Sequence, residues 1–156
     1  MTDEDFMRLA IRKTREGIAA GQSPFGAVIV KNGEVVAATH NTVWKTTDPT
    51  AHAEVNCIRA AASALKTIFL HGCTMYSTTE PCPMCLSAIH WAKIERVVFG
   101  AVIADASDAG FHELYVPARE LARLGGSPLK VENGLLQEEC AALFREWQQA
   151  GKCGTY

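Results

Sequence analysis

The stretch from Asp48 to Ala101 reads DPTAHAEVNCIRAAASALKTIFLHGCTMYSTTEPCPMCLSAIHWAKIERVVFGA. Its apolar pattern predicts the order helix, strand, helix, strand, at residues 48–65, 74–78, 81–91 and 96–101. Asp48 followed by Pro49 is typical of a helix N-cap and first helical position. Strands that alternate with helices need crossover connections, so this stretch predicts a pair of parallel strands.

The residues before this stretch predict a helix and a hairpin. Met7, Ala10 and Ile11 begin an apolar face of a helix that ends near Gly21. Asn32-Gly33 is a strong hairpin signal, and it separates two antiparallel strands. Those two strands are expected at residues 26–30 and 34–40, and loops at 41–47 and 105–110. The rest of the chain predicts a short helix within 114–124, an edge strand at 129–132, a last helix at 136–147 and a flexible tail at 151–156.

Length and charge bound the class of protein. A chain of 156 residues can form one domain, residues 1–156, with a sizeable core. The 17 acidic and 15 basic residues are intermixed and give a net charge of -2, which argues against a nucleic-acid partner. No apolar run is long enough to span a membrane, and the acidic start is unlike a secretory signal. We therefore expect a cytoplasmic protein whose six cysteines are thiols or metal ligands.

Two short motifs carry the chemistry, His52-Ala53-Glu54 and Pro81-Cys82-Pro83-Met84-Cys85, each at the start of a predicted helix. His52, Cys82 and Cys85 are three metal ligands, and a zinc site with three protein ligands leaves a fourth position for water. The helix dipole at Cys82 favours the thiolate, which is the metal-binding form. Glu54 lies two residues after His52, off the ligand's own helix face, and can accept a proton near the metal without binding it.

This combination resembles the signature of zinc-dependent nucleobase deaminases, H-x-E followed by P-C-x-x-C. The chain is identified as a member of the cytidine deaminase-like superfamily over essentially its whole length. The resemblance implies a three-layer α/β/α fold whose mixed five-stranded sheet has an N-terminal antiparallel hairpin and parallel later strands. It also implies hydrolytic deamination with one Zn²⁺ per subunit, water as the fourth ligand and Glu54 as the catalytic proton carrier.

The segments around the motifs resemble those of bacterial guanine deaminases. Ala109-Gly110-Phe111, followed by the carboxylate of Glu113, is the most specific of them. Guanine presents its N1-H and 2-amino group as adjacent donors, and an ionised carboxylate accepts from such a pair. The resemblance assigns Glu113 to catalysis and to base binding, and gives the substrate-binding residues as Phe25, Asn41, Ala53, Glu113 and Tyr156. It implies conversion of guanine to xanthine and ammonia in purine metabolism, by a homodimer whose C-terminal segment, residues 151–156, covers the partner's site.

Three alternatives stay open from the sequence. The base could be cytosine, an aminated triazine or another purine, and tRNA adenosine is a further substrate to consider. In a different class, the chain would be a zinc-stabilised binding protein, with Cys57 or Cys73 as a fourth ligand that closes the metal shell. The remaining expectations concern side chains outside the motifs: a pocket wall at Trp44, a core position for Trp91, structural roles for His71 and His90, and free or buried thiols at Cys140 and Cys153.

Overall fold

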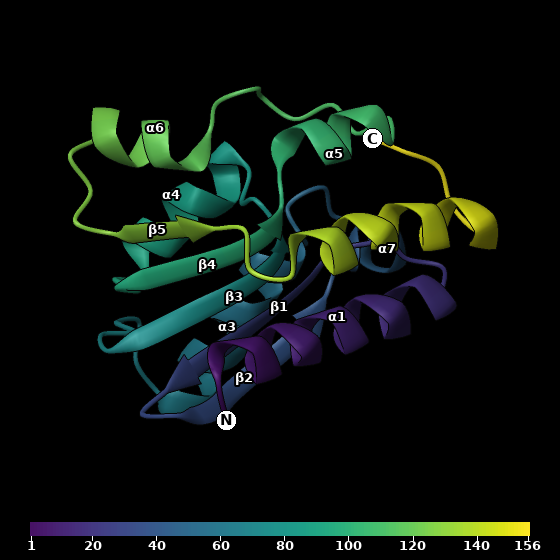
Figure 1. Cartoon of the computed structure of the whole chain (residues 1–156). Helices are drawn as coiled ribbons and strands as arrows, with labels where there is room; N and C mark the ends of the chain where they lie inside the picture. Colours follow the sequence, from purple (N-terminus) through teal and green to yellow (C-terminus); the bar gives the residue numbers. More distant parts are fainter.

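A five-stranded sheet forms the centre of the computed structural model, which describes all 156 residues (Figure 1). The strands lie in the order β2-β1-β3-β4-β5. β1 is antiparallel to both β2 and β3, whereas β3, β4 and β5 are parallel. The predicted mixed sheet is confirmed, with strands at Gly26–Lys31 (β1), Glu34–His40 (β2), Cys73–Thr79 (β3), Arg96–Ala101 (β4) and Lys130–Asn133 (β5).

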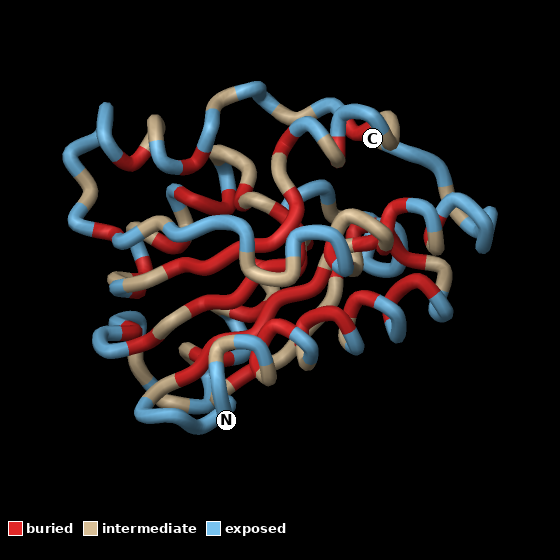
Figure 2. Tube along the Cα trace, viewed as in Figure 1, coloured by how far each residue is buried: buried red, intermediate tan, exposed pale blue.

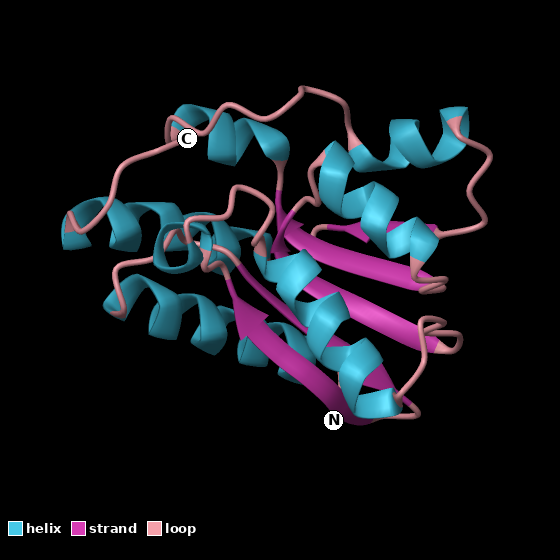
Figure 3. Cartoon of the chain, turned by 180° about the vertical axis from the view of Figure 1, so that it is seen from behind, coloured by secondary structure: helices cyan, strands magenta, loops and turns pink.

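Helices cover both faces of this sheet, which gives three layers (Figures 1 and 3). One face carries α1 (Asp3–Ala19), α5 (Ile103–Asp108) and α7 (Gln137–Ala150). The other carries α3 (Ala53–Leu65), α4 (Pro83–Trp91) and α6 (Ala118–Leu124), and α2 (Val43–Thr46) is a single turn after β2. Burial is concentrated in the central strands and in the helix faces turned toward them (Figure 2).

The first helix shows how local sequence sets this packing. Thr2 caps α1, because its hydroxyl accepts from the Asp5 N–H while the Asp5 carboxylate accepts from the Thr2 N–H. The apolar face of α1 then packs on β1 so closely that a Cβ at Gly26 would clash with Thr14 and with the backbone of Ala10. Glycine is therefore required at the start of β1, where the chain enters the sheet.

The prediction that Asp48 caps the second long helix was wrong. α3 begins at Ala53, and its N-cap is His52. The Asp48 carboxylate instead accepts hydrogen bonds from the N–H and O–H of Thr50, at 2.8 and 2.7 Å. The Asp48 side chain is therefore engaged in a local turn, four residues before the position where the helix is capped. The imidazole of His52 makes no capping hydrogen bond.

Two segments expected to be loops contain short helices. Residues 41–47 include α2, and residues 105–110 overlap α5, which starts at Ile103. In α5 the Asp105 carboxylate accepts from the Val102 N–H at 2.9 Å, and Ala106 is buried against the sheet. A capping bond and two buried side chains thus outweigh the small, polar composition that indicated a loop.

Two further expectations need correction. The helix expected within residues 114–124 begins only at Ala118, because Pro117 takes the N-cap position. Trp91 is not a core residue: it lies at the end of α4 with 76 % of its surface exposed, and the Lys93 ammonium lies 5.9 Å from its ring centroid.

None of the helices combines the length and apolar character that crossing a lipid bilayer requires.

Strand direction places the two motifs at one edge of the sheet. The carboxyl ends of β3 and β4 lie at this edge, together with the start of the antiparallel β1 and the end of β2. Ligand sites of open α/β sheets form where parallel strands end. The segments that follow β2 and β3 lead directly into Asn41 and into the Cys82 motif.

Candidate active site

Three metal-ligand side chains meet at the N-termini of α3 and α4. His52 and Cys82 are the N-cap residues of these helices, and Cys85 lies in the first turn of α4. The His52 Nδ1 atom is 3.6 Å from Cys82 Sγ and 3.5 Å from Cys85 Sγ. All three ligand atoms lie within 4.8 Å of one another, and no fourth His, Cys, Asp or Glu belongs to the group.

The electrostatics of this cluster favour a metal cation. The pKa of Cys82 is lowered to about 4, because the Cys85 thiol donates a hydrogen bond to its thiolate and His52 lies beside it. The bond to Cys82 and burial both raise the pKa of Cys85. One imidazole nitrogen and two sulfurs at these separations suit tetrahedral zinc with one position left over. The donor set therefore fits the zinc that the sequence predicts.

The cysteines considered as a closing fourth ligand lie elsewhere. Cys57 is a fully buried residue of α3, with its Sγ 3.5 Å from the carbonyl oxygens of Ala27 and Ala37. Cys73 is the first residue of β3, at the end of that strand opposite to the Cys82 motif. Neither thiol belongs to the group, which offers a metal ion three candidate ligands.

A buried carboxyl group lies beside the cluster without joining it. Glu54 is 6 % exposed, and burial raises its pKa above the ordinary range. Its Oε2 lies 3.5 Å from Cys85 Sγ, and its Oε1 lies 3.2 Å from the Ser77 hydroxyl. A carboxyl group held this way can exchange a proton with a molecule in the adjoining pocket.

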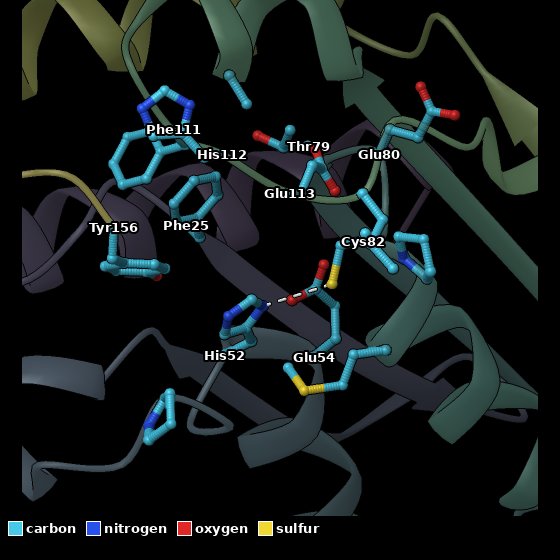
Figure 4. Close-up of a pocket in the computed structure, with 15 residues that line it drawn as sticks. Phe25, His52, Glu54, Thr79, Glu80, Cys82, Phe111, His112, Glu113 and Tyr156 are labelled. Carbon is cyan, nitrogen blue, oxygen red and sulfur yellow. Dashed lines mark hydrogen bonds between the residues drawn. The ribbon is translucent and has the colours of Figure 1, made fainter.

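That pocket has a volume of about 270 Å³ and opens in front of the cluster (Figure 4). Glu113 forms part of the wall, and its Oε2 atom is buried without a hydrogen-bond partner. Burial raises the pKa of Glu113 to about 8, and the thiolate of Cys82 and the carboxylate of Glu54 add to the rise. A buried acceptor without a partner is costly to a protein, so it points to a ligand that would supply a donor.

Aromatic rings form a second wall of the pocket. The Phe25 and Phe111 ring centroids are 5.0 Å apart in an edge-to-face arrangement, and Tyr156 packs edge-on against Phe111 at 5.4 Å. Asn41 Nδ2 donates to the Tyr156 hydroxyl at 2.7 Å. Rings set at these angles leave a flat apolar surface, which suits one face of a planar heterocycle.

The C-terminal residue lies in this chain's own pocket. The ring centroids of Tyr156 and His52 are 5.9 Å apart, and the Tyr156 backbone oxygen accepts from the His112 N–H at 3.0 Å. Trp44 is half exposed and packs edge-on against Tyr156 at 6.3 Å, outside the pocket itself. The exchange of this tail between subunits stays a prediction.

Most of the predicted site residues come together here. Those that line the pocket are Phe25, His52, Glu54, Cys82, Glu113 and Tyr156. Asn41 and Ala53 are fully buried behind this surface, and Cys85 is buried with them. Sequence reasoning missed Thr79, Glu80 and His112, which also line the pocket (Figure 4). Thr79 and Glu80 directly precede the Pro81-Cys82 motif, and this position was the signal that could have found them.

Comparison with known proteins supports a zinc site formed by His52, Cys82 and Cys85. The family described as cytidine and deoxycytidylate deaminase zinc-binding region matches residues 1–101, which include both motifs. The chain belongs to this family. It is accordingly a deaminase with the cytidine deaminase-like fold.

Individual relatives cover more of the chain. Guanine deaminase from Bacillus subtilis is 45 % identical over 117 residues, which are 74 % of this chain and 75 % of that protein. A tRNA-specific adenosine deaminase from the same species is 36 % identical over 154 residues, 96 % of this chain and 93 % of the relative. The solved structure of guanine deaminase from Nitrosomonas europaea has a TM-score of 0.88 at 29 % identity, covering 95 % of this chain and 85 % of that one. Relatives with two different substrates match this deaminase, so the substrate has to be argued from its pocket.

Proposed function

We propose that this deaminase hydrolyses the amino group of a free base, converting guanine to xanthine and ammonia. The observation that carries the proposal is the Glu113 oxygen, which is buried in the pocket wall and has no partner. Guanine offers two adjacent donors, its N1-H and 2-amino group. Their hydrogen bonds would favour the ionised form of the Glu113 carboxyl group, whose pKa is about 8 before a base is bound. Adenine and cytosine do not present that pair.

His52, Cys82 and Cys85 would hold the zinc ion. Bound there, zinc would act as a Lewis acid that makes a water molecule acidic near neutral pH. Glu54 would accept a proton from the water that attacks C2 of the base, and would pass that proton to N3. The bond from C2 to the exocyclic nitrogen then breaks. The amine takes the remaining proton of the hydroxyl group added to C2 and leaves as ammonia, and the oxygen stays on C2 as a carbonyl. The raised pKa of the buried Glu54 suits a group that both takes and returns a proton.

The remaining residues would orient the base. Phe25 would pack against one face of the ring, and Glu113 would accept from its donor edge. Asn41 already donates to the Tyr156 hydroxyl, and its second amide hydrogen would be free for the base. Ala53, the first residue of α3, would contact the base through its backbone, and Tyr156 in the C-terminal tail would close the pocket.

A substrate panel tests this proposal. Ammonia release is measured for guanine, cytosine, an aminated triazine, 2-aminopurine and adenine, and inosine formation is measured on an anticodon stem-loop. We expect guanine to give the highest kcat/KM. Inosine formation without guanine turnover would establish the tRNA reaction instead, for which the match of 96 % of this chain to a tRNA-specific adenosine deaminase is the supporting observation. Zinc binding without release of ammonia from any base would support the non-catalytic class.

We further propose a cytoplasmic homodimer in which the tail is exchanged. The Tyr156 hydroxyl, which accepts from Asn41 of its own chain in the structure, would then make the same contact in the partner's pocket. A chain shortened after Ala150 tests the exchange, and chromatography with light scattering gives its subunit number. Loss of both the dimer and the activity is expected. A shortened chain that remains an active dimer contradicts the exchange.

A further inference from the structure

Glu80, the residue after β3, connects three parts of the molecule. Its Oε1 accepts from the Ile103 N–H at 3.2 Å, and its Oε2 accepts from the Ala118 N–H at 2.8 Å. Its own N–H donates to the Ala101 oxygen at 2.8 Å, in continuation of the sheet. Ile103 and Ala118 are the first residues of α5 and α6. One carboxylate therefore ties the starts of two helices to the end of a strand.

The segment between these two helices carries Glu113 and has few other attachments. Residues 109–117 contain no helix or strand, and Leu114 and Tyr115 are 73 % and 66 % exposed. Buried Phe111 anchors the first part of the segment. The Glu113 carboxylate has no hydrogen bond to the protein that would fix its position. The His112 N–H donates to the Tyr156 oxygen at 3.0 Å and holds the middle of the segment, and Glu80 holds its distal end.

The charge of Glu80 is matched only by backbone donors. No lysine, arginine or histidine lies within ion-pair distance of it. A carboxylate offers acceptors on both oxygens, which is what two N–H groups require. A glutamine of the same shape would keep one acceptor and turn an amide donor toward the other N–H.

We propose that Glu80 is a positioning residue for substrate selection, which acts by fixing the segment that carries Glu113. Glu80 aligns α5 with α6, and the alignment sets where the Glu113 carboxylate faces the base. The role in selection rests on the proposed function of Glu113, whereas the mechanical tie is independent of which base is bound.

Amide hydrogen exchange of the full-length, zinc-loaded protein tests whether Glu80 fixes the segment between α5 and α6. We expect Glu80→Gln to speed amide exchange at Ile103 and across residues 110–118 by at least ~10-fold, with unchanged zinc content. Glu95→Gln is the matched control, because Glu95 also accepts a backbone N–H, from Gly72 at 2.8 Å, at the opposite end of the sheet. Glu80→Asp keeps the charge but shortens the side chain, and it should loosen the same amides. Unchanged exchange in both Glu80 variants overturns the inference.

A double-mutant cycle tests the role in selection. We expect Glu80→Gln to lower kcat/KM for guanine about 10-fold in the natural sequence, and less than about 2-fold in a Glu113→Gln background. Equal losses in both backgrounds would show that Glu80 does not act through Glu113, and would overturn the positioning role. A natural chain that releases no ammonia from guanine contradicts both the proposed function and the role in substrate selection. The hydrogen-exchange experiment would still show whether Glu80 fixes residues 110–118.

Discussion

Replacing Glu113 by Gln should make the protein more stable while it makes the enzyme worse. The carboxylate lies in the pocket wall with one oxygen buried and unpartnered, and its pKa rises from an ordinary 4.5 to about 8. Each pKa unit corresponds to about 1.4 kcal/mol, which sets an upper limit of about 5 kcal/mol on the cost of ionisation. The group is partly exposed, and solvent screening reduces the cost to about 1–2 kcal/mol. In a chain of this size that gain raises Tm by about 3–6 °C.

The pH dependence gives this prediction its sign. Below pH 4.5 Glu113 is protonated in both the folded and the unfolded chain, so the substitution changes little. As the pH rises from 4.5 to about 8, the unfolded chain releases the proton while the folded chain keeps it. The natural protein therefore loses stability relative to Glu113→Gln across this window, and the difference is constant above it.

Urea unfolding of the zinc-free protein, followed by circular dichroism at pH 5.5, 7.0 and 8.5, measures the difference, because a bound zinc ion would itself lower the pKa of Glu113. Glu120→Gln is the control, because Arg123 lowers the pKa of this exposed carboxyl and its loss should not stabilise the fold. The activity on guanine should fall at least ~10-fold in Glu113→Gln, since a charged acceptor is lost. Equal stability of the two proteins at pH 8.5, or the same gain at all three pH values, would refute the reasoning.

Three more predictions concern the metal site and the fold. Glu54→Gln should keep the zinc content and lose at least ~100-fold in kcat, measured by ammonia release; near-normal turnover contradicts its proton-carrier role. A chelator should abolish activity and lower Tm, and zinc should restore both; activity that survives with no metal detectable rules out the proposed site. Arg96 bonds Asp3 of α1 at 2.6 Å and Glu132 of β5 at 2.7 Å, and Arg96→Gln should cost about 1 kcal/mol in urea unfolding. Arg123→Gln, which breaks only an exposed pair within α6, should cost less, and equal losses would contradict this ranking.

The sequence predicted the metal cluster because the cluster depends on short local spacings. Cys82 and Cys85 lie one turn apart, and the strand-helix order brings His52 to the same end of the sheet. Strand positions were predictable for a similar reason, since β4 is a continuous apolar run with clear boundaries. These features need only short spacings and the order of neighbouring helices and strands.

Features that depend on distant contacts were not predictable. α5 is stabilised by burial of Ala106 against α7 and the sheet, which its small, polar composition does not reveal. The position of Tyr156 depends on a bond to Asn41, 115 residues earlier. Glu80 could be seen as a neighbour of the cysteine motif, but its bonds to two helix starts required the folded chain.

The donors of the cluster sit at the beginnings of α3 and α4, whereas the base would be read by a stretch between α5 and α6. On the proposed function, the metal ligands and the carboxylate that distinguishes guanine thus lie in separate portions of the polypeptide. Exchanging residues 109–117 for the matching portion of a related enzyme would redirect substrate choice without disturbing the ion. With this arrangement, changes in one short connecting segment would alter the specificity while the metal site is kept.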